Sequence, residues 1–171
     1  MSNIRLVGLE SVRIGDISAN KAMSTTLATI SATVPDSAHL IIEAPTATDL
    51  YVEEEDLPDI SILGTSKKTL EFATRDMGSL VLLEAFGGSF NGTTGAWSAP
   101  VTATTVKESC LEAVSKVING KQLKIEIPRA SVKTGGDLRF TKTESGQITF
   151  SCDVLVPASS VAISPIVITQ V

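Results

Sequence analysis

The stretch Lys67–Gly88, which reads KKTLEFATRDMGSLVLLEAFGG, places a strand directly before a helix. Leu70 and Phe72 alternate with polar neighbours, and this period of two is typical of a half-buried strand. Over 76–86 the apolar residues instead recur every three or four positions, which predicts an amphipathic helix with Asp76 as its N-cap. The closing Gly-Gly pair favours the end of that helix. A helix this short is not stable alone in water, so we expect it to pack on a sheet.

The segments upstream of this stretch predict further strands and one long arm. The expected strands are rich in β-branched or alternating apolar residues: Ile4–Ile14 with a bend near Gly8, Thr25–Val34, and a buried strand over Ala38–Ala44. Between the third strand and Lys67 the pattern is mixed, which predicts an arm at about 45–66 with little regular structure. Segments of this length in a compact domain are usually functional or ordered by a partner.

The residues downstream of the helix predict an exposed loop and then two hairpins. Ser89–Gly95 is rich in Gly, Asn and Thr and predicts the loop. Asn119-Gly120 favours a tight hairpin turn, because both of its residues must adopt positive φ. We expect Pro128 to end the second strand of that hairpin. The strands expected in this half are Val106–Ile118, Lys121–Ile127, Leu138–Lys142, Gln147–Val156 and Val161–Val171.

Together these elements predict a mainly β fold. We expect an antiparallel β-sandwich or barrel-like sheet with one flanking α-helix at about 76–86. At 171 residues the chain is most simply a single domain over 1–171, with the arm at about 45–66 projecting from it. An antiparallel sheet has edges that must be closed, covered or paired, and pairing them with other copies of the chain produces rings or tubes.

Composition narrows the class of protein. The chain has 14 basic and 19 acidic residues and a formal charge of −5, whereas a domain that reads nucleic acid is usually basic. We expect Cys110 and Cys152 to be buried free thiols. The N-terminal residues form no apolar run long enough for a signal peptide, and no stretch is long enough to span a bilayer. We therefore expect synthesis in the cytoplasm of the producing cell and no membrane anchor.

Residues suited to catalysis or to cofactor binding are scarce. His39 is the only histidine, so a Ser-His-Asp triad would have to use it, and a histidine metal site is excluded. The two cysteines lie too far apart in sequence for a zinc pair, and no glycine-rich segment has the spacing of a phosphate-binding loop. We expect no enzymatic activity, no cofactor and no metal.

The acidic run in the arm allows three interpretations. Calcium binding is the weakest, because consecutive carboxylates cannot all converge on one ion. A solvated loop and a contact with basic residues of a neighbouring subunit have equal weight. For the contact we name Glu53, Glu54, Glu55, Asp56 and Asp59, with Lys67 and Lys68 foremost among the basic partners, followed by Lys121, Lys124, Arg129 and Lys133.

Three stretches together resemble the tail tube (major tail) proteins of tailed bacteriophages. The first is EEEDLPD at Glu53–Asp59 with KKTLEF at Lys67–Phe72. The second is DMGSLVLLEAFGG from Asp76, with the loop that follows it as far as Pro100. The third is GKQLKIEIPRA at Gly120–Ala130, followed by VLVP at Val154–Pro157. These are patterns of fold and assembly, and none of them is a catalytic signature.

The resemblance implies a structural role in the virion tail. In that family six subunits form a ring, a sheet from each subunit joins its neighbours' sheets in one inner barrel, and the rings stack into a tube that delivers DNA. It implies that the helix lies on the outer flank, that the arm contacts a neighbouring subunit or ring, and that DNA passes without specific binding. The expected partners are other copies of this chain and other tail proteins. We expect the C-terminal hairpins to line the bore.

Other β proteins remain as alternatives. A tube terminator, and the inner tube of a phage-derived contractile injection system, share the same fold in that family. A capsid-decorating or adhesin-like β-sandwich would act as a monomer or trimer. An enzyme is the least favoured class, because no acid–base pair or nucleophile is evident in the sequence.

Overall fold

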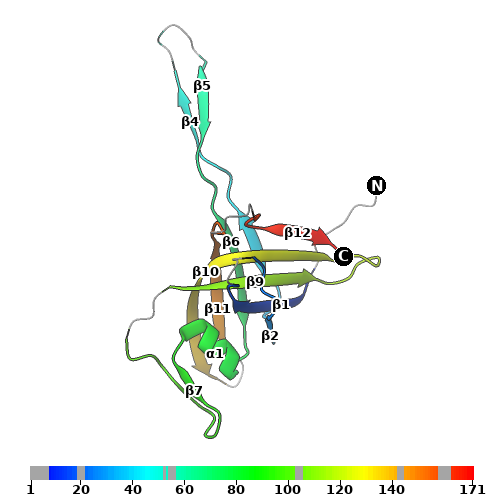
Figure 1. Ribbon diagram of the computed structural model, residues 1–171, viewed down its shortest axis with the longest axis vertical. Coiled ribbons are helices and arrows are strands. Elements are labelled where there is room, and N and C mark those ends of the chain that lie inside the picture. The colour runs from blue at the N-terminus through cyan, green and yellow to red at the C-terminus, as the bar shows by residue number, and fades with distance from the viewer. Residues whose placement is uncertain are drawn as a thin grey trace.

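The computed structural model describes residues 8–18, 22–51, 53, 57–102, 106–141, 145–157 and 163–171. These residues form a mainly β structure with antiparallel sheets and one helix, as predicted (Figure 1). In chain order the elements are β1 (Leu9–Asp16), β2 (Ala28–Ile30), β3 (His39–Ile42), β4 (Ala47–Leu50), β5 (Ile60–Leu63), β6 (Lys68–Thr74), α1 (Ser79–Phe86), β7 (Ser89–Asn91), β8 (Ala96–Ser98), β9 (Lys107–Ser115), β10 (Leu123–Phe140), β11 (Ser145–Val154) and β12 (Val167–Gln170).

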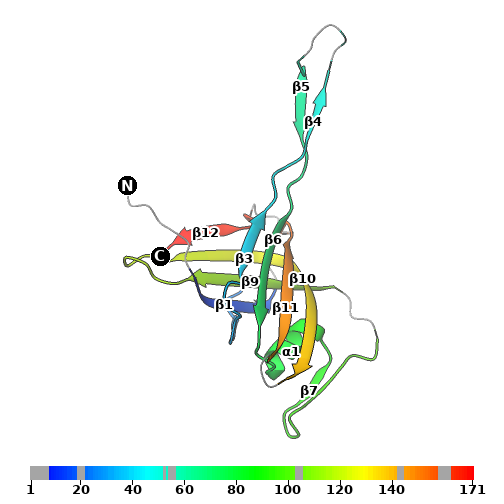
Figure 2. The ribbon, with the colours of Figure 1, turned by 180° about the vertical axis from the view of Figure 1, so that it is seen from behind.

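The long strand β10 folds the main sheet into two layers. Its first part, from Leu123, pairs with β9 on one side and β12 on the other, whereas from Ala130 onward it pairs with β11. We call β2-β1-β9-β10-β12 the first layer and β10-β11-β6-β3 the second layer. Figures 1 and 2 show the strands of the two layers crossing steeply. This is the arrangement of an orthogonal sandwich, in which a bent strand belongs to both sheets.

The bend in β10 lies at the proline that was expected to end the strand. The register with β9 shifts between Ile127 and Ala130, so Pro128 stands in an irregularity of the ladder. A bulge tolerates proline because the missing N–H is not needed by the partner strand. The prediction that Pro128 ends the strand is therefore wrong, and the residue instead marks the passage from one layer to the other.

The core lies between the layers and is built from alternating residues of both. Ile148, Phe150 and Cys152 of β11 are buried, as their alternation predicts, and Phe150 stacks on Phe72 of β6 with ring centroids 4.7 Å apart. The first layer contributes Val12, Ile14, Leu111, Ala113, Ile125 and Ile127 to the same cluster.

Helix α1 covers the end of the second layer that the first layer leaves open (Figures 1 and 2). Its Val81 is buried, and the hydroxyl of Thr134 in β10 donates to the carbonyl of Ala85, so the helix packs on the sheet as expected. Gly87 is the C-cap of the helix. Its φ is 69°, and its N–H donates to the carbonyl of Leu83 at 3.0 Å. The predicted start is wrong: Gly78 is the N-cap, and Asp76 accepts a hydrogen bond from the N–H of Gly78 before the helix begins.

The Asn119-Gly120 turn is confirmed, whereas two other predictions are corrected. Both turn residues have positive φ, 53° and 73°, between the bridge partners Ile118 and Lys121. The expected loop at Ser89–Gly95 is instead part of the β7–β8 hairpin. The expected buried strand at Ala38–Ala44 is instead β3, which among the described strands pairs with β6 alone and so forms an edge, and its Ile41 and Ile42 are exposed.

Three further strands differ in extent from the predictions. The N-terminal strand runs to Asp16, and its predicted residues 4–7 lie outside the described residues. Only Ala28–Ile30 of the second predicted strand forms a strand, and the last strand starts at Val167. The second C-terminal hairpin is confirmed by the pairing of β10 with β11, although residues 142–144 of its turn are not described.

Candidate functional site

The arm is a two-stranded hairpin that continues the second layer beyond the body (Figure 1). Where the arm leaves the body, the N–H of Glu43 donates a hydrogen bond to the carbonyl of Lys67 at 2.9 Å. Beyond this bond β4 pairs with β5, from Ala47 opposite Leu63 to Leu50 opposite Ile60, and with no other strand of the described residues. The expectation of little regular structure in the arm is therefore wrong. Each strand has four residues, too few to show a clear period in the sequence.

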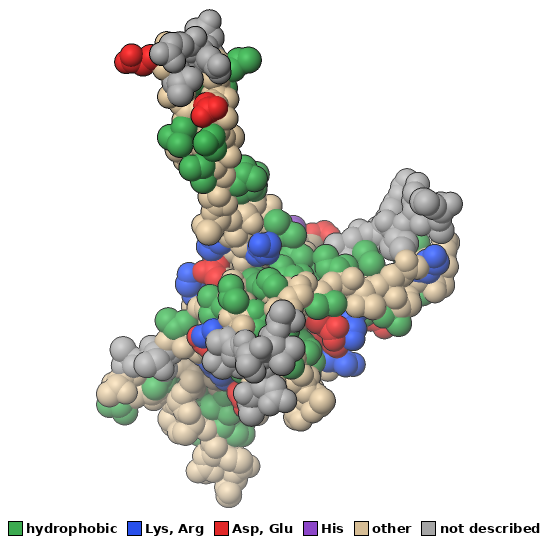
Figure 3. All heavy atoms as spheres, turned by 45° about the horizontal axis from the view of Figure 1, so that its top comes forward, with side chains coloured by type: hydrophobic (Ala, Val, Ile, Leu, Met, Phe, Trp, Pro, Cys, Tyr) green, Lys and Arg blue, Asp and Glu red, His purple; other side chains and the backbone are tan. Residues whose placement is uncertain are grey.

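One face of the arm is apolar and exposed. The register places Leu50, Ile60 and Ile62 on this face, and they are 48%, 52% and 54% exposed. Figure 3 shows hydrophobic side chains along the arm. An isolated two-stranded hairpin is marginally stable at best in water, and exposed apolar patches mark interaction sites. The arm thus has the composition of a segment that a partner covers.

Of the acidic residues expected to make contacts, Glu53 and Asp59 lie toward the end of the arm, whereas Lys67 and Lys68 lie at its base. Glu53 and Asp59 are exposed, whereas Glu54, Glu55 and Asp56 lie outside the described residues. Lys68 donates to the hydroxyl of Ser66 at 3.4 Å. Within one subunit the structure does not bring Glu53 or Asp59 to these lysines.

Lys67 belongs to a charged group centred on Asp153. The Asp153 carboxylate lies 2.6 Å from Nζ of Lys133 and 3.0 Å from Nζ of Lys67, and it accepts a hydrogen bond from the Thr69 hydroxyl at 3.0 Å. The hydrogen bond from Lys133, together with those from Lys67 and Thr69, lowers the pKa of Asp153 to about 2 despite partial burial. The bond to Asp153 correspondingly raises the pKa of Lys67.

The other basic residues considered as partners for the arm are mostly paired within their own subunit. Lys124 lies 2.8 Å from Glu126, and Arg129 lies 2.7 Å from Glu108. Lys121 follows the Asn-Gly turn at the end of the β9–β10 hairpin. Ion pairs already made within a subunit reduce the attraction that these groups can offer to a neighbour's acidic arm.

The second layer has two open edges. In the described part of the chain, no strand pairs with the outer edge of β3 or with the outer edge of β10 beyond Val132. Because neighbouring strands of this layer all run antiparallel, the two edge strands point in opposite directions. The β10 edge of one copy could therefore pair with the β3 edge of another, and the antiparallel alternation would continue across the junction.

The outer face of the second layer is polar, and many of its groups already have partners. Ser151 donates to Glu71 at 3.4 Å, and Thr149 donates to the carbonyl of Gly135 at 3.2 Å. Lys133 and Asp153 form an ion pair on this face, with 2.6 Å between Nζ and the carboxylate. A face of this kind offers few uncompensated cations to a phosphate backbone.

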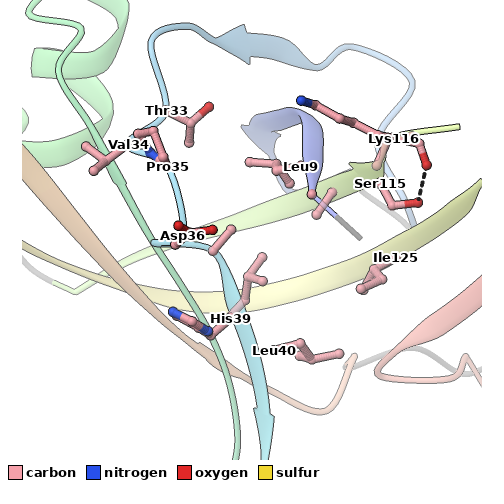
Figure 4. Close-up of a pocket in the computed structure, with 15 residues that line it drawn as sticks. Leu9, Thr33, Val34, Pro35, Asp36, His39, Leu40, Ser115, Lys116 and Ile125 are labelled. Carbon is pink, nitrogen blue, oxygen red and sulfur yellow. Dashed lines mark hydrogen bonds between the residues drawn. The ribbon is translucent and has the colours of Figure 1, made fainter. Parts of the chain in front are cut away.

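A cavity of about 480 Å³ opens between the layers beside β3 (Figure 4). His39 and Asp36 lie at its rim, and Leu70 and Ile125 are part of its wall. The hydroxyl of Ser115 donates to the carbonyl of Lys116 at 3.3 Å, not to the histidine. These lining residues do not assemble a Ser-His-Asp triad.

The two cysteines are buried free thiols, as predicted. Burial raises the pKa of Cys152 to about 12, which suppresses the reactive thiolate. Among the described residues, no group of three or more His, Cys, Asp or Glu side chains could hold a metal ion. No helix in the described ranges has the length and apolar character needed to cross a membrane.

Comparison with known proteins adds no assignment. No family model matches the chain, and no curated protein matches it in sequence.

Proposed function

We propose that the protein is a virion structural subunit whose copies join into hexameric rings, and that these rings stack into the tail tube through which DNA is delivered. The proposal includes no enzymatic activity. Three features support it: the resemblance in the stretches quoted above, the open edges of the second layer, and the apolar arm. The edges are the observation on which the proposal chiefly depends.

In the proposed ring the second layer forms the wall of the bore. The β10 edge of each subunit pairs with the β3 edge of the next, so the sheet is continuous around the ring. The outer face of this layer lines the bore, and α1, which packs on the opposite face, lies on the outer flank. The β10–β11 hairpin is part of the lining of the bore, which is the position expected for the C-terminal hairpins.

The polar bore face suits the passage of DNA. Lys133 and Lys67 share the carboxylate of Asp153 on this face. Tight binding of DNA requires cations that displace counterions from phosphates. Paired charges and hydroxyls on this face would let DNA slide past without being held.

The ring is tested by microscopy and mass measurement on concentrated, purified protein. We expect negative-stain images of rings or tubes and a species with six times the 17.9 kDa subunit mass. Ile41→Lys in the β3 edge should abolish both by placing a charge at the junction. Ile168→Lys, at a similarly exposed position in β12, is the matched control and should assemble normally.

A small monodisperse species at every concentration would contradict the tube. That outcome would favour a capsid-decorating or adhesin-like module. A single ring that never stacks would favour a tube terminator. The inner tube of a phage-derived contractile injection system predicts the same rings, so genomic context distinguishes it.

A further inference from the structure

We propose that an apolar pocket at the end of the body opposite the arm is the receptor for the arm of a second copy of this chain. The inference rests on the proposed function and specifies the partner surface of the arm. It depends on three observations: the shape of the pocket, the charge of its lining, and its position relative to the arm.

The pocket has a volume of about 540 Å³ and lies between α1, the β7–β8 hairpin and the end of the β10–β11 hairpin. Its apolar walls are Met77, Leu82, Phe86, Trp97 and Leu138. The indole N–H of Trp97 donates to the carbonyl of Gly87 at 2.9 Å, and its ring lies 6.1 Å from that of Phe86. The wall is thus held in place before any partner binds, which lowers the entropic cost of docking.

The charges of the pocket and the arm are complementary. Among the described residues that line the pocket, only Arg75 and Arg139 are charged. Arg139 also pairs with Asp137, whereas Arg75 is exposed, and the neighbouring Asp76 carboxylate accepts the N–H of Gly78. The arm contains six acidic and no basic residues between positions 45 and 66. Such complementarity selects a partner and sets its orientation.

The arm and the pocket lie at opposite ends of the long axis, so the arm of one subunit cannot fill that subunit's own pocket (Figures 1 and 2). A contact between two different surfaces of identical subunits is heterologous, and when it does not close into a ring it propagates as an open stack. The edges of the second layer would then build the ring, and the arm would join one ring to the next. In that contact Leu50, Ile60 and Ile62 enter the pocket, and Glu53 and Asp59 face Arg75.

Disulfide cross-linking between variants that each carry one added cysteine tests the contact directly. Ile60→Cys on the arm is mixed with Leu138→Cys on the pocket rim and oxidised. Cys110 and Cys152 are buried and give little background. We expect a cross-linked dimer from the mixture and a ladder of oligomers from the double variant. Val117→Cys, with an exposure similar to that of Leu138, replaces the pocket variant as the matched control and should give neither.

A charge reversal supplies a second, independent readout. Arg75→Glu should raise the concentration for half-assembly roughly tenfold, because it places like charges together at the contact. Adding Asp59→Arg should restore most of the loss. Lys116→Glu, at an exposed position just after β9, is the control for net charge and should have little effect.

The outcomes distinguish this inference from the proposed tube. Rings or tubes without the Ile60–Leu138 cross-link, or with a pocket cysteine that stays fully reactive toward maleimide, would overturn the receptor and leave the tube in place. Equal cross-linking to Val117→Cys would also overturn the receptor. Failure to assemble under any condition would overturn both. Cross-linking without rings would support the arm–pocket contact and reject the ring.

Discussion

The ring of Phe86 lies directly on Gly136: a Cβ added to Gly136 would stand 2.8 Å from Cζ of the phenylalanine. Helix α1 therefore packs on the second layer at a position in β10 where any residue larger than glycine would displace the Phe86 ring. The contact joins the helix to the sheet that we propose to line the bore, and it also forms part of the wall of the arm receptor.

Gly136→Ala is expected to destabilise the fold by about 1–3 kcal/mol, because the added methyl group overpacks the helix–sheet contact. Urea denaturation followed by tryptophan fluorescence measures the change, since Trp97 packs against Phe86. Gly135→Ala, one residue away, is the control. There the methyl group would meet only the Thr149 hydroxyl, at 3.2 Å, and we expect a smaller loss. Equal losses of stability at both positions would contradict a specific contact between Phe86 and Gly136.

Asp153 makes stability depend on pH in the acid range. Its pKa is lowered from 3.8 to about 2 in the folded protein, so its contribution is fully present above about pH 4 and is lost as the pH falls toward 2. Because both lysine partners are more than half exposed, solvent screening leaves a contribution of about 1 kcal/mol. Asp153→Asn should be less stable than wild type by that amount at pH 7 and equal to it near pH 2. A constant difference over this range would refute the assignment.

The sequence predicts best those elements whose conformation depends on residues close together in the chain. Asn119-Gly120 specifies its turn through the φ angles of two residues, and β11 shows its buried face through simple alternation. Pro128 was misjudged because its position depends on two partner strands that lie far away in the sequence. The run Leu40-Ile41-Ile42 predicted a buried strand, but an edge strand that awaits a partner has the same composition.

The candidate surfaces were predictable only in part. The acidic composition of the arm is evident in the sequence, and so is its length. The apolar face of the arm is not evident in the sequence, because it depends on the register that sets Leu50 opposite Ile60. Arg75 and Arg139 were not considered as partners, since sequence spacing does not reveal that they line one pocket with Trp97.

Cys110 and Cys152 should not react with thiol reagents in the folded protein. Burial raises the pKa of both thiols, so we expect no reaction with Ellman's reagent at pH 8 within the time in which the unfolded chain reacts completely. The count of reactive thiols should rise from zero to two on denaturation. Rapid labelling of the folded protein would show that the layers open around Cys110 or Cys152.

The arm should be dispensable for folding and required for assembly. Among the described strands β4 and β5 pair only with each other, so Ile60→Ser with Ile62→Ser should leave the stability of the body unchanged. The same double substitution removes most of the apolar face that we propose a second copy covers, so tubes should be lost. Ala47→Ser with Leu63→Ser, on the opposite face of the arm, is the matched control and should assemble. Thermal unfolding measures the first property, and negative-stain microscopy measures the second.

Shortening the tip separates the acidic residues from the apolar face. Deletion of residues 53–58 removes four of the six acidic side chains of the arm and keeps both strands. We expect a folded protein that assembles poorly at physiological salt, because its attraction to the basic rim of a neighbour is reduced. Screening weakens that attraction in the wild type as well, so raising the salt concentration should narrow the difference between the two. Normal tubes from the deletion at low and at high salt would show that the apolar face alone makes the contact.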